Sequence, residues 1–257
     1  SGSDIYLTLD SQIQLILEDA MTKLEENNEF TWATFTVMDA NTGAIVGSAS
    51  SPDFNPNTLE GLTNYVNPLV GYTYEPGSTM KIFSWLAAME NGVYDGEEEF
   101  MSGSIEVAGA TIYDFNNAGW GMINYDTGFA YSSNVGATNL ALKLEEKQKG
   151  TLKEFYESLG FGSKTGIELP GEESGVLRLT YESEIATASF GQGITTTPIQ
   201  TLQALSILTN DGIMLKPYIV DKIVDENGNV TYEGGRTELG RKVSSDSVKK
   251  VYSLMYD

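Results

Sequence analysis

The chain reads EPGSTMKIFSWLAAME at residues 75–90, and the rest of the sequence is interpreted outward from this stretch. Pro76 and Gly77 mark a turn, and the apolar residues after them recur at helical spacing. Ser78 and Lys81 therefore fall on one helix face, with their Cβ atoms about 5–6 Å apart. A lysine amine at that distance can take the proton of a serine hydroxyl. The stretch predicts a serine nucleophile with a lysine base.

The residue types that the chain lacks support this interpretation. The 257 residues include no histidine and no cysteine. Without them there is neither a Ser-His-Asp triad nor a thiol nucleophile, so a lysine-activated serine is the most plausible route to covalent catalysis. Metal ligation without histidine or cysteine needs a carboxylate cage, which the sequence does not show. We therefore expect no metal and no cofactor.

Ser-x-x-Lys by itself is weak evidence, because a second match, Ser247 to Lys250, lies in an ordinary amphipathic pattern near the C-terminus. Ser78 differs from Ser247 because it opens its helix. Unpaired backbone N–H groups and the positive end of the helix dipole favour negative charge there. The alternative is that Ser78 is only a helix N-cap, a common role for serine. The local sequence leaves both readings open.

Two further segments favour the catalytic reading. Residues 131–137 read YSSNVGA, just before a helical run from Asn139 to Leu144. Ser132 and Asn134 offer a hydroxyl that can relay a proton and an amide that can hold a substrate amide, although a polar helix cap is again the alternative. Residues 190–200 read FGQGITTTPIQ. Coincidence of all three segments, in this order, is improbable.

Together these segments resemble the transpeptidase domain of class B penicillin-binding proteins of Gram-positive type. Residues 5–14 (IYLTLDSQIQ), 39–46 (DANTGAIV) and 160–172 also resemble that family, so the likeness covers nearly the whole chain. It implies an α+β fold of the penicillin-binding and serine β-lactamase type, with an antiparallel sheet packed by helices and a mostly helical lobe. Residues 1–257 are expected to be one partial transpeptidase domain without membrane anchor or pedestal domain.

The chain departs from the family at its third motif, a Lys-Ser/Thr-Gly triplet on a strand that lines the active site. Its one such triplet is Lys164-Thr165-Gly166, within GSKTGIELPGE at residues 162–172. Glycine and proline on both sides favour a loop over a central strand. We therefore expect the fold to be incomplete at the C-terminus. The remaining strands are expected on a second polypeptide, or to have been removed, and the chain alone is expected to be nearly inactive.

The resemblance also implies a role for each site residue. Ser78 attacks the carbonyl of a peptidoglycan stem peptide ending in D-Ala-D-Ala, with Lys81 as base. Ser132 relays the proton to the leaving amine, and Asn134 and Gly193 bind the substrate. β-Lactam antibiotics acylate Ser78 by the same route. Lys81 needs a pKa well below its free value of about 10.4, which burial and a neighbouring cation, the third-motif lysine, supply.

Three other functions stay open at this point. A serine β-lactamase and a D,D-carboxypeptidase share the Ser-x-x-Lys arrangement but release the acyl group to water, and a non-catalytic β-lactam sensor acylates and signals. The net charge of −21 argues against nucleic acid as a partner, because nucleic-acid binding needs a basic surface. The resemblance implies a membrane-anchored enzyme on the extracytoplasmic face that works with the cell-wall synthesis machinery.

Local patterns predict the elements around the site. A helix over 11–26 is expected to begin with a capping box of Ser11 and Gln14. Its buried residues are expected to be Ile13, Ile16, Ala20, Met21 and Leu24. Strands at 31–38 and 44–50 are expected to form a hairpin through residues 41–43. Thr197-Pro198-Ile199-Gln200 is expected to start a helix, and residues 217–233 to form a second hairpin about Asn227-Gly228-Asn229.

Overall fold

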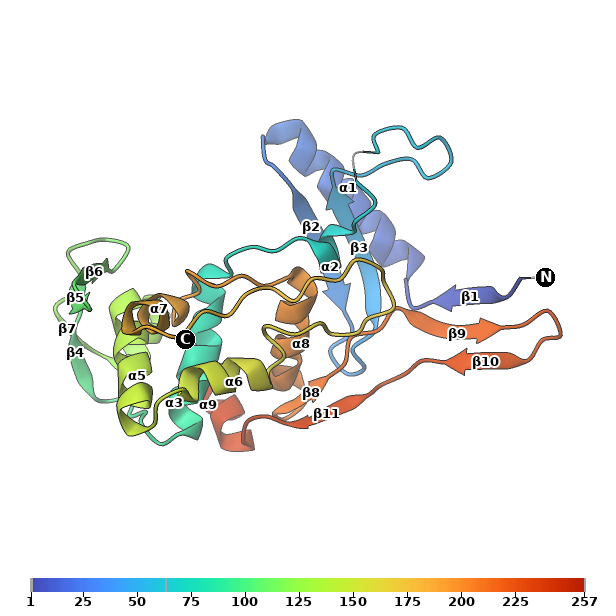
Figure 1. The fold of residues 1–257 in the computed structure, drawn as a ribbon. Coiled ribbons are helices and arrows are strands. Elements are labelled where there is room, and N and C mark those ends of the chain that lie inside the picture. Colours follow the sequence, from blue (N-terminus) through green and yellow to red (C-terminus); the bar gives the residue numbers. More distant parts are fainter. Residues whose placement is uncertain (1, 63, 257) are drawn as a thin grey trace. The chain divides into compact units, whose positions relative to one another are not determined.

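The computed structural model describes residues 2–62 and 64–256, and the chain divides into two compact units. The first unit is made of Ser1–Thr73, Ser163–Ser174 and Thr197–Gly240, and the second of Tyr74–Gly162, Gly175–Thr196 and Arg241–Asp257. Each unit thus gathers three separate stretches of sequence, which can be followed by colour in Figure 1. Helices and strands occur in both units, as expected for an α+β fold.

The first unit holds the N-terminal helix and most of the longer strands. Its elements are β1 (Asp4–Leu7), α1 (Ser11–Asn27), β2 (Ala33–Met38), β3 (Ile45–Ser51), α2 (Pro68–Gly71), α8 (Pro198–Thr209), β8 (Ile213–Leu215), β9 (Val220–Val224), β10 (Val230–Glu233) and β11 (Glu238–Arg241), which ends at the boundary of the unit. The described strands pair in small sheets with the orders β1-β9-β10, β8-β11 and β2-β3.

The hairpin of β2 and β3 has the antiparallel pairing that the sequence predicts, from Ala33 opposite Ser51 to Val37 opposite Gly47. Its turn is held by the Asp39 carboxylate, which accepts hydrogen bonds from the backbone N–H groups of residues 41 and 42 at 2.8 and 3.0 Å. Gly43 then adopts a φ of +84°, a left-handed conformation that favours glycine. The predicted hairpin is confirmed.

Helix α1 packs on β3, but its cap and its buried face differ from prediction. The N-cap is Asp10, whose carboxylate accepts from the N–H groups of the second and third helical residues. The predicted burial of Ile16 is wrong, since 66% of its surface is exposed. The inner face instead runs through Ile13 and Leu17 to Met21, at the i, i+4 spacing of one helix stripe. Gly47 of β3 lets that stripe approach closely, because a Cβ there would press on the first two of these side chains.

Helix α8 and the second hairpin form as predicted. Thr197 caps α8 and exchanges hydrogen bonds with Gln200 in a capping box. Strand β9 pairs antiparallel with β1 on one side and β10 on the other. The core of this unit is aliphatic, with Ile45, Leu69, Val70, Ile167, Ile199, Ile219 and Val220 all buried.

The second unit is mostly helical and is built around α3. Its elements are the 3₁₀ turn η1 (Gly77–Met80), α3 (Lys81–Glu90), β4 (Glu99–Met101), β5 (Ser104–Val107), β6 (Ala110–Tyr113), β7 (Met122–Asn124), α4 (Tyr125–Ala130), α5 (Asn134–Lys147), α6 (Thr151–Ser158), α7 (Glu182–Ala188) and α9 (Ser245–Tyr256). Strand β4 pairs with β7, and β5 with β6.

Helix α3 is buried along most of its length, with residues 85–88 fully inaccessible to solvent. Its C-cap is Asn91, and the next residue, Gly92, has a φ of +68°. A central helix enclosed by its neighbours is a rigid base for the residues at its N-terminal end.

Across the described residues, the helices are either too short or too polar to cross a membrane.

Candidate active site

Ser78 lies in the turn that leads into α3. This first turn is a 3₁₀ turn rather than the α-helical turn that the pattern predicts, and the α-helix proper begins at Lys81. The N-cap position is Pro76, and no side chain caps the turn. The alternative reading of Ser78 as a helix cap therefore does not hold. Ser78 is solvent-exposed as a residue, and its hydroxyl accepts a hydrogen bond from a lysine instead.

The Lys81 side chain joins the two predicted serines. Its Nζ atom donates to Ser78 Oγ at 3.0 Å, to Ser132 Oγ at 2.9 Å and to the Ser132 carbonyl oxygen at 2.6 Å. Only 3% of the Lys81 surface is exposed. Lys81 and Ser132 are 51 positions apart in sequence, yet the hydroxyls of both predicted serines lie within hydrogen-bonding distance of the Lys81 amine.

Burial changes the acid–base behaviour of this amine. Desolvation lowers the pKa of Lys81 from 10.5 to about 8, while the negative charge of Asp114 acts in the opposite direction. A charged ammonium loses hydration energy in a buried site, so the equilibrium shifts towards the neutral form relative to a lysine in water. Burial alone therefore produces the lowered pKa that a general base needs, without a second cation.

Ser132 is held in place by a tight turn between α4 and α5. Its φ is +53°, an unusual value for a residue with a Cβ atom. The N–H of Ser132 donates to the carbonyl of Phe129 at 2.9 Å, and the N–H of Ser133 donates to that of Gly128 at 2.8 Å. Ser133 then caps α5 by accepting from the N–H of Gly136 at 3.0 Å. This turn directs the Ser132 hydroxyl to Lys81.

Asn134 and Gly193, the two predicted substrate-binding residues, both belong to the second unit, as do Ser78, Lys81 and Ser132. The Asn134 side chain is half-buried, and its Nδ2 donates to the Tyr113 carbonyl at 3.0 Å. Gly193 has a φ of +74°, and its N–H donates to a carboxylate oxygen of Glu75 at 2.8 Å. The amide of Asn134 is thus fixed by a neighbouring strand, and Gly193 is tied to the segment just before Ser78.

The loop that carries Gly193 also contacts the nucleophile turn directly. Gly77 donates its N–H to the Gly191 carbonyl at 3.0 Å. A Cβ atom at Gly191 would collide with the backbone of Gly77. The absence of a side chain at Gly191 therefore allows this backbone contact. This contact explains why the Gly-Gln-Gly segment accompanies Ser78 in the sequence.

Sequence reasoning missed Asp114, which is fully buried behind the Ser132 turn. Its carboxylate accepts from the N–H of Gly103 at 2.8 Å, the hydroxyl of Ser133 at 2.8 Å and the N–H of Val135 at 3.1 Å. These partners lie 11 to 21 positions away in sequence. No local pattern could have indicated them, because only the tertiary fold brings them together.

Lys164-Thr165-Gly166 lies in irregular structure in the first unit, and Lys164 is solvent-exposed. Glu172 accepts hydrogen bonds from the N–H and hydroxyl of Thr165 at 2.8 and 2.6 Å, and from the N–H of Gly166 at 2.8 Å. The triplet is therefore a carboxylate-anchored loop. The prediction that it is not a strand motif is confirmed.

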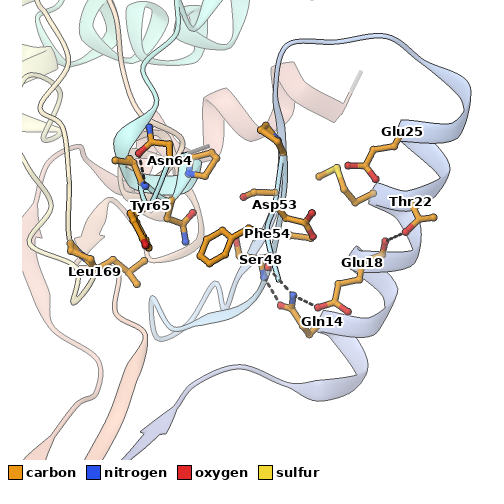
Figure 2. Close-up of a pocket in the computed structure, with 18 residues that line it drawn as sticks. Gln14, Glu18, Thr22, Glu25, Ser48, Asp53, Phe54, Asn64, Tyr65 and Leu169 are labelled. Carbon is orange, nitrogen blue, oxygen red and sulfur yellow. Dashed lines mark hydrogen bonds between the residues drawn. The ribbon is translucent and has the colours of Figure 1, made fainter. Parts of the chain in front are cut away.

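A cavity of about 640 Å³ lies in the first unit (Figure 2), and none of the residues that line it is predicted to be catalytic. It is bordered by α1, β3 and the loops at 52–54, 64–68 and 169–170. Its polar lining includes the carboxylates Glu18, Glu25 and Asp53, and Gln14, whose side chain is bound to the backbone of Ser48. No lysine lines it, so it offers no base for a serine. The described residues also contain no cluster of three or more carboxylates that could hold a metal ion.

Comparison with known proteins assigns the fold. Residues 33–257 match the family described as the penicillin binding protein transpeptidase domain. The chain is 32% identical over 257 residues to stage V sporulation protein D of Bacillus subtilis, covering 97% of this chain and 39% of that protein. It is 30% identical over 261 residues to a probable peptidoglycan D,D-transpeptidase, PenA, of Neisseria flavescens, covering 99% of this chain and 61% of that protein.

Solved structures agree with these matches. Penicillin-binding protein 2X of Streptococcus thermophilus superposes with a TM-score of 0.90 and 33% identity, covering 99% of this chain and 38% of that one. Penicillin-binding protein 3 of Mycobacterium tuberculosis in complex with aztreonam superposes with a TM-score of 0.87 and 28% identity, covering 98% and 57%. The chain spans about two fifths of the length of stage V sporulation protein D. Its sequence and fold make it a member of the penicillin-binding protein transpeptidase family.

Proposed function

We propose that this protein is a serine D,D-transpeptidase that cross-links peptidoglycan stem peptides through an acyl-enzyme on Ser78, and that β-lactams inhibit it by acylating the same serine. The observation that carries the proposal is the buried Lys81 amine in contact with both serine hydroxyls. The names of relatives support it, since several are probable peptidoglycan D,D-transpeptidases. The aztreonam complex of one structural relative supports the inhibitor class.

The first half of the reaction uses the three contacts of Lys81. The neutral amine accepts the Ser78 proton while Oγ attacks the carbonyl carbon of the penultimate D-Ala. Ser132, bonded to the same amine at 2.9 Å, passes that proton to the departing nitrogen. The peptide bond breaks, the terminal D-Ala leaves as a neutral amine, and Ser78 holds the remaining peptide as an ester.

The second half transfers the acyl group. An amine on a neighbouring stem peptide attacks the ester and loses its proton to Lys81, and Ser78 regains a proton as the new amide forms. With a pKa of about 8, about one Lys81 in ten is neutral at pH 7, whereas an unperturbed lysine is almost entirely charged. Asn134 and Gly193 hold the substrate backbone in this scheme.

The proposal includes a third Lys-Ser/Thr-Gly motif on a strand outside residues 1–257. One observation supports it: the triplet at residues 164–166 is a loop bound to Glu172. Such a strand supplies the second oxyanion N–H donor, and loss of one donor costs roughly 10²–10³ in rate. We expect residues 1–257 alone to acylate slowly for this reason.

The cellular setting is also part of the proposal. The enzyme is held at the extracytoplasmic face of the membrane by an anchor outside residues 1–257. There it acts on stem peptides together with the cell-wall synthesis machinery. This placement follows from the family, whose substrate, peptidoglycan, lies outside the cell membrane.

Labelling of the full-length protein with a fluorescent penicillin tests the proposal. We expect one adduct per molecule, located on the peptide that contains Ser78 by mass spectrometry, and absent in Ser78→Ala. A Ser247→Ala variant is the matched control and should label normally. An adduct on Ser132 or Ser247 would contradict the assignment. The lifetime of the adduct separates the alternatives: release within seconds would indicate a β-lactamase, and a long-lived adduct without D-Ala release from model peptides would indicate a sensor.

A further inference from the structure

Asp114 is a buried carboxylate that the reaction scheme does not use. It directly follows β6 and none of its surface is exposed. One oxygen accepts from the N–H of Gly103, and the other accepts from the Ser133 hydroxyl and the Val135 N–H. Burial of a carboxylate is costly unless hydrogen bonds compensate for the lost hydration. The presence of a fully buried carboxylate beside the Ser132 turn, despite this cost, therefore points to a specific role for Asp114.

The partners of Asp114 define what it holds. Ser133 and Val135 flank the first helical residue of α5, Asn134, and the preceding residue in β6, Tyr113, accepts a hydrogen bond from the Asn134 amide. The end of β6 therefore contacts the three residues that follow Ser132. Ser132 itself has a left-handed φ of +53°, a conformation that is unfavourable for a residue with a Cβ atom. The carboxylate helps to maintain that turn.

Asp114 is also the charged group that acts on Lys81. The carboxylates of neighbouring elements are engaged elsewhere: Glu75, before η1, accepts from Gly193; Glu90, at the far end of α3, accepts from Ser244; and Asp126, in α4, accepts from Lys250. Helix α5 has no acidic residue in its first turn. Within the described residues, Asp114 is the carboxylate whose charge raises the pKa of the Lys81 amine.

We propose that Asp114 is a positioning residue for acylation, which acts through Ser133 and Val135 to hold the Ser132 hydroxyl against the Lys81 amine. The kinetic part of this inference rests on the proposed function. The geometric part does not, because the hydrogen bonds and the burial are independent of the reaction. Two consequences follow: loss of the carboxylate loosens the Ser132 turn, and loss of its charge makes Lys81 easier to deprotonate.

The Asp114→Asn variant tests both consequences in the full-length protein. It removes the charge while keeping the size of the side chain. We expect the second-order rate of acylation by a fluorescent penicillin to fall at least tenfold at its optimum pH. We also expect the acid limb of the pH profile, which reports Lys81, to shift to lower pH. The direction follows because the negative charge of Asp114 favours the charged form of Lys81.

Two further variants separate positioning from simple structural damage. Ser133→Ala removes one hydrogen bond to Asp114, together with the cap on the Gly136 N–H, but keeps the charge of Asp114, so acylation should slow without a shift of the acid limb. Asp126→Asn removes a carboxylate of the same unit, and should leave both rate and profile unchanged. If Asp114→Asn fails to fold, Ser133→Ala decides the positioning role by itself. Full-rate acylation by Ser133→Ala and Asp114→Asn, or a slow Asp114→Asn enzyme with an unmoved acid limb, would overturn the inference.

Lysine side-chain NMR distinguishes failure of this inference from failure of the proposed function. If the wild-type protein forms no adduct, the proposed function fails, and titration of the Lys81 amine then judges the inference directly. A lower Lys81 pKa in Asp114→Asn than in the wild type supports it. An equal or higher value contradicts it.

Discussion

The two Ser-x-x-Lys segments of this protein, at residues 78–81 and 247–250, have identical spacing but different surroundings. Lys81 is 3% exposed, and its amine contacts two serine residues. The Lys250 side chain is 39% exposed, and its amine forms an ion pair with Asp126 at 2.7 Å. Ser247 accepts a hydrogen bond from the Ser244 hydroxyl at 3.1 Å, at the start of α9.

The difference shows what a short motif does and does not determine. Spacing places a serine and a lysine on one helix face in both cases. Burial away from a direct carboxylate partner favours the neutral amine, and only that form can accept a proton. An ammonium paired with a carboxylate anchors one helix to another. The neighbours contributed by the fold therefore decide which lysine is able to act as a base.

The largest expected effect separates the two lysines by their role in acylation. Lys81→Met removes the proposed base, and should lower the acylation rate of the full-length protein by about 10³ or more, within the range of general-base catalysis. Lys250→Met and Lys164→Ala should acylate within twofold of the wild type. Stopped-flow measurement with a fluorescent penicillin checks these rates. A large loss in Lys164→Ala would mean that the loop at 164–166 takes part in the reaction.

A second, smaller loss is expected for the relay. Ser132→Ala keeps the nucleophile and the base but removes the hydroxyl that receives the second hydrogen bond of Lys81. Acylation should slow by about 10². Ser244→Ala, which removes the hydroxyl that donates to Ser247, is the matched control and should keep the wild-type rate. If the two variants react equally fast, the proton reaches the leaving group by a route other than Ser132.

Much of the fold around these residues could be predicted from local sequence. The turn at residues 41–43 and the cap at Thr197 have side-chain signatures that act within three or four residues, and both elements form as predicted. The proximity of Ser78 and Lys81 could be predicted for the same reason, because helix geometry alone places them together. The Ser132 contact was inferred from family resemblance, since 51 residues separate it from Lys81.

Features that depend on tertiary contacts could not be predicted in this way. Ile16 fits the helical pattern, yet the stripe through Ile13, Leu17 and Met21 covers β3 because Gly47 admits it. Asp114 has partners up to 21 positions away, and its burial is not encoded by its immediate neighbours. Likewise, the close backbone contact between Gly77 and Gly191 needs glycine at position 191, but a single sequence does not show which segments meet.

A third prediction concerns the cost of keeping Lys81 neutral. Its pKa is about 8 in the folded state and 10.5 for the free side chain. Between these values the unfolded chain binds more protons than the folded chain, so stability rises with pH through this window. Below pH 8 both states are protonated and the cost is present in full. At about 1.4 kcal/mol per pKa unit, the difference amounts to about 3 kcal/mol.

Urea unfolding of wild type and Lys81→Met at several pH values measures this term. We expect the free energy of unfolding of the wild type to rise relative to that of the variant between pH 8 and 10.5, by up to about 3 kcal/mol. Lys250→Met should run parallel to the wild type over the same range. Parallel curves for the wild type and Lys81→Met would show that the pKa of Lys81 is not lowered in the folded state.

The smallest expected effect is on the stability that the second lysine provides. Lys250 and Asp126 have side chains 39% and 25% exposed, so solvent screens their attraction, and the pair is worth about 0.2–1 kcal/mol. Lys250→Met should therefore lower the free energy of unfolding by no more than about 1 kcal/mol. Lys153, whose pair with Glu157 is longer at 3.8 Å and more exposed, supplies the control, since Lys153→Met should change stability even less. High salt should shrink both differences, because exposed ion pairs are screened. If Lys250→Met costs several kcal/mol, α9 is held to α4 mainly through this pair. In that case Lys250 would be as important for the stability of the fold as Lys81 is expected to be for acylation.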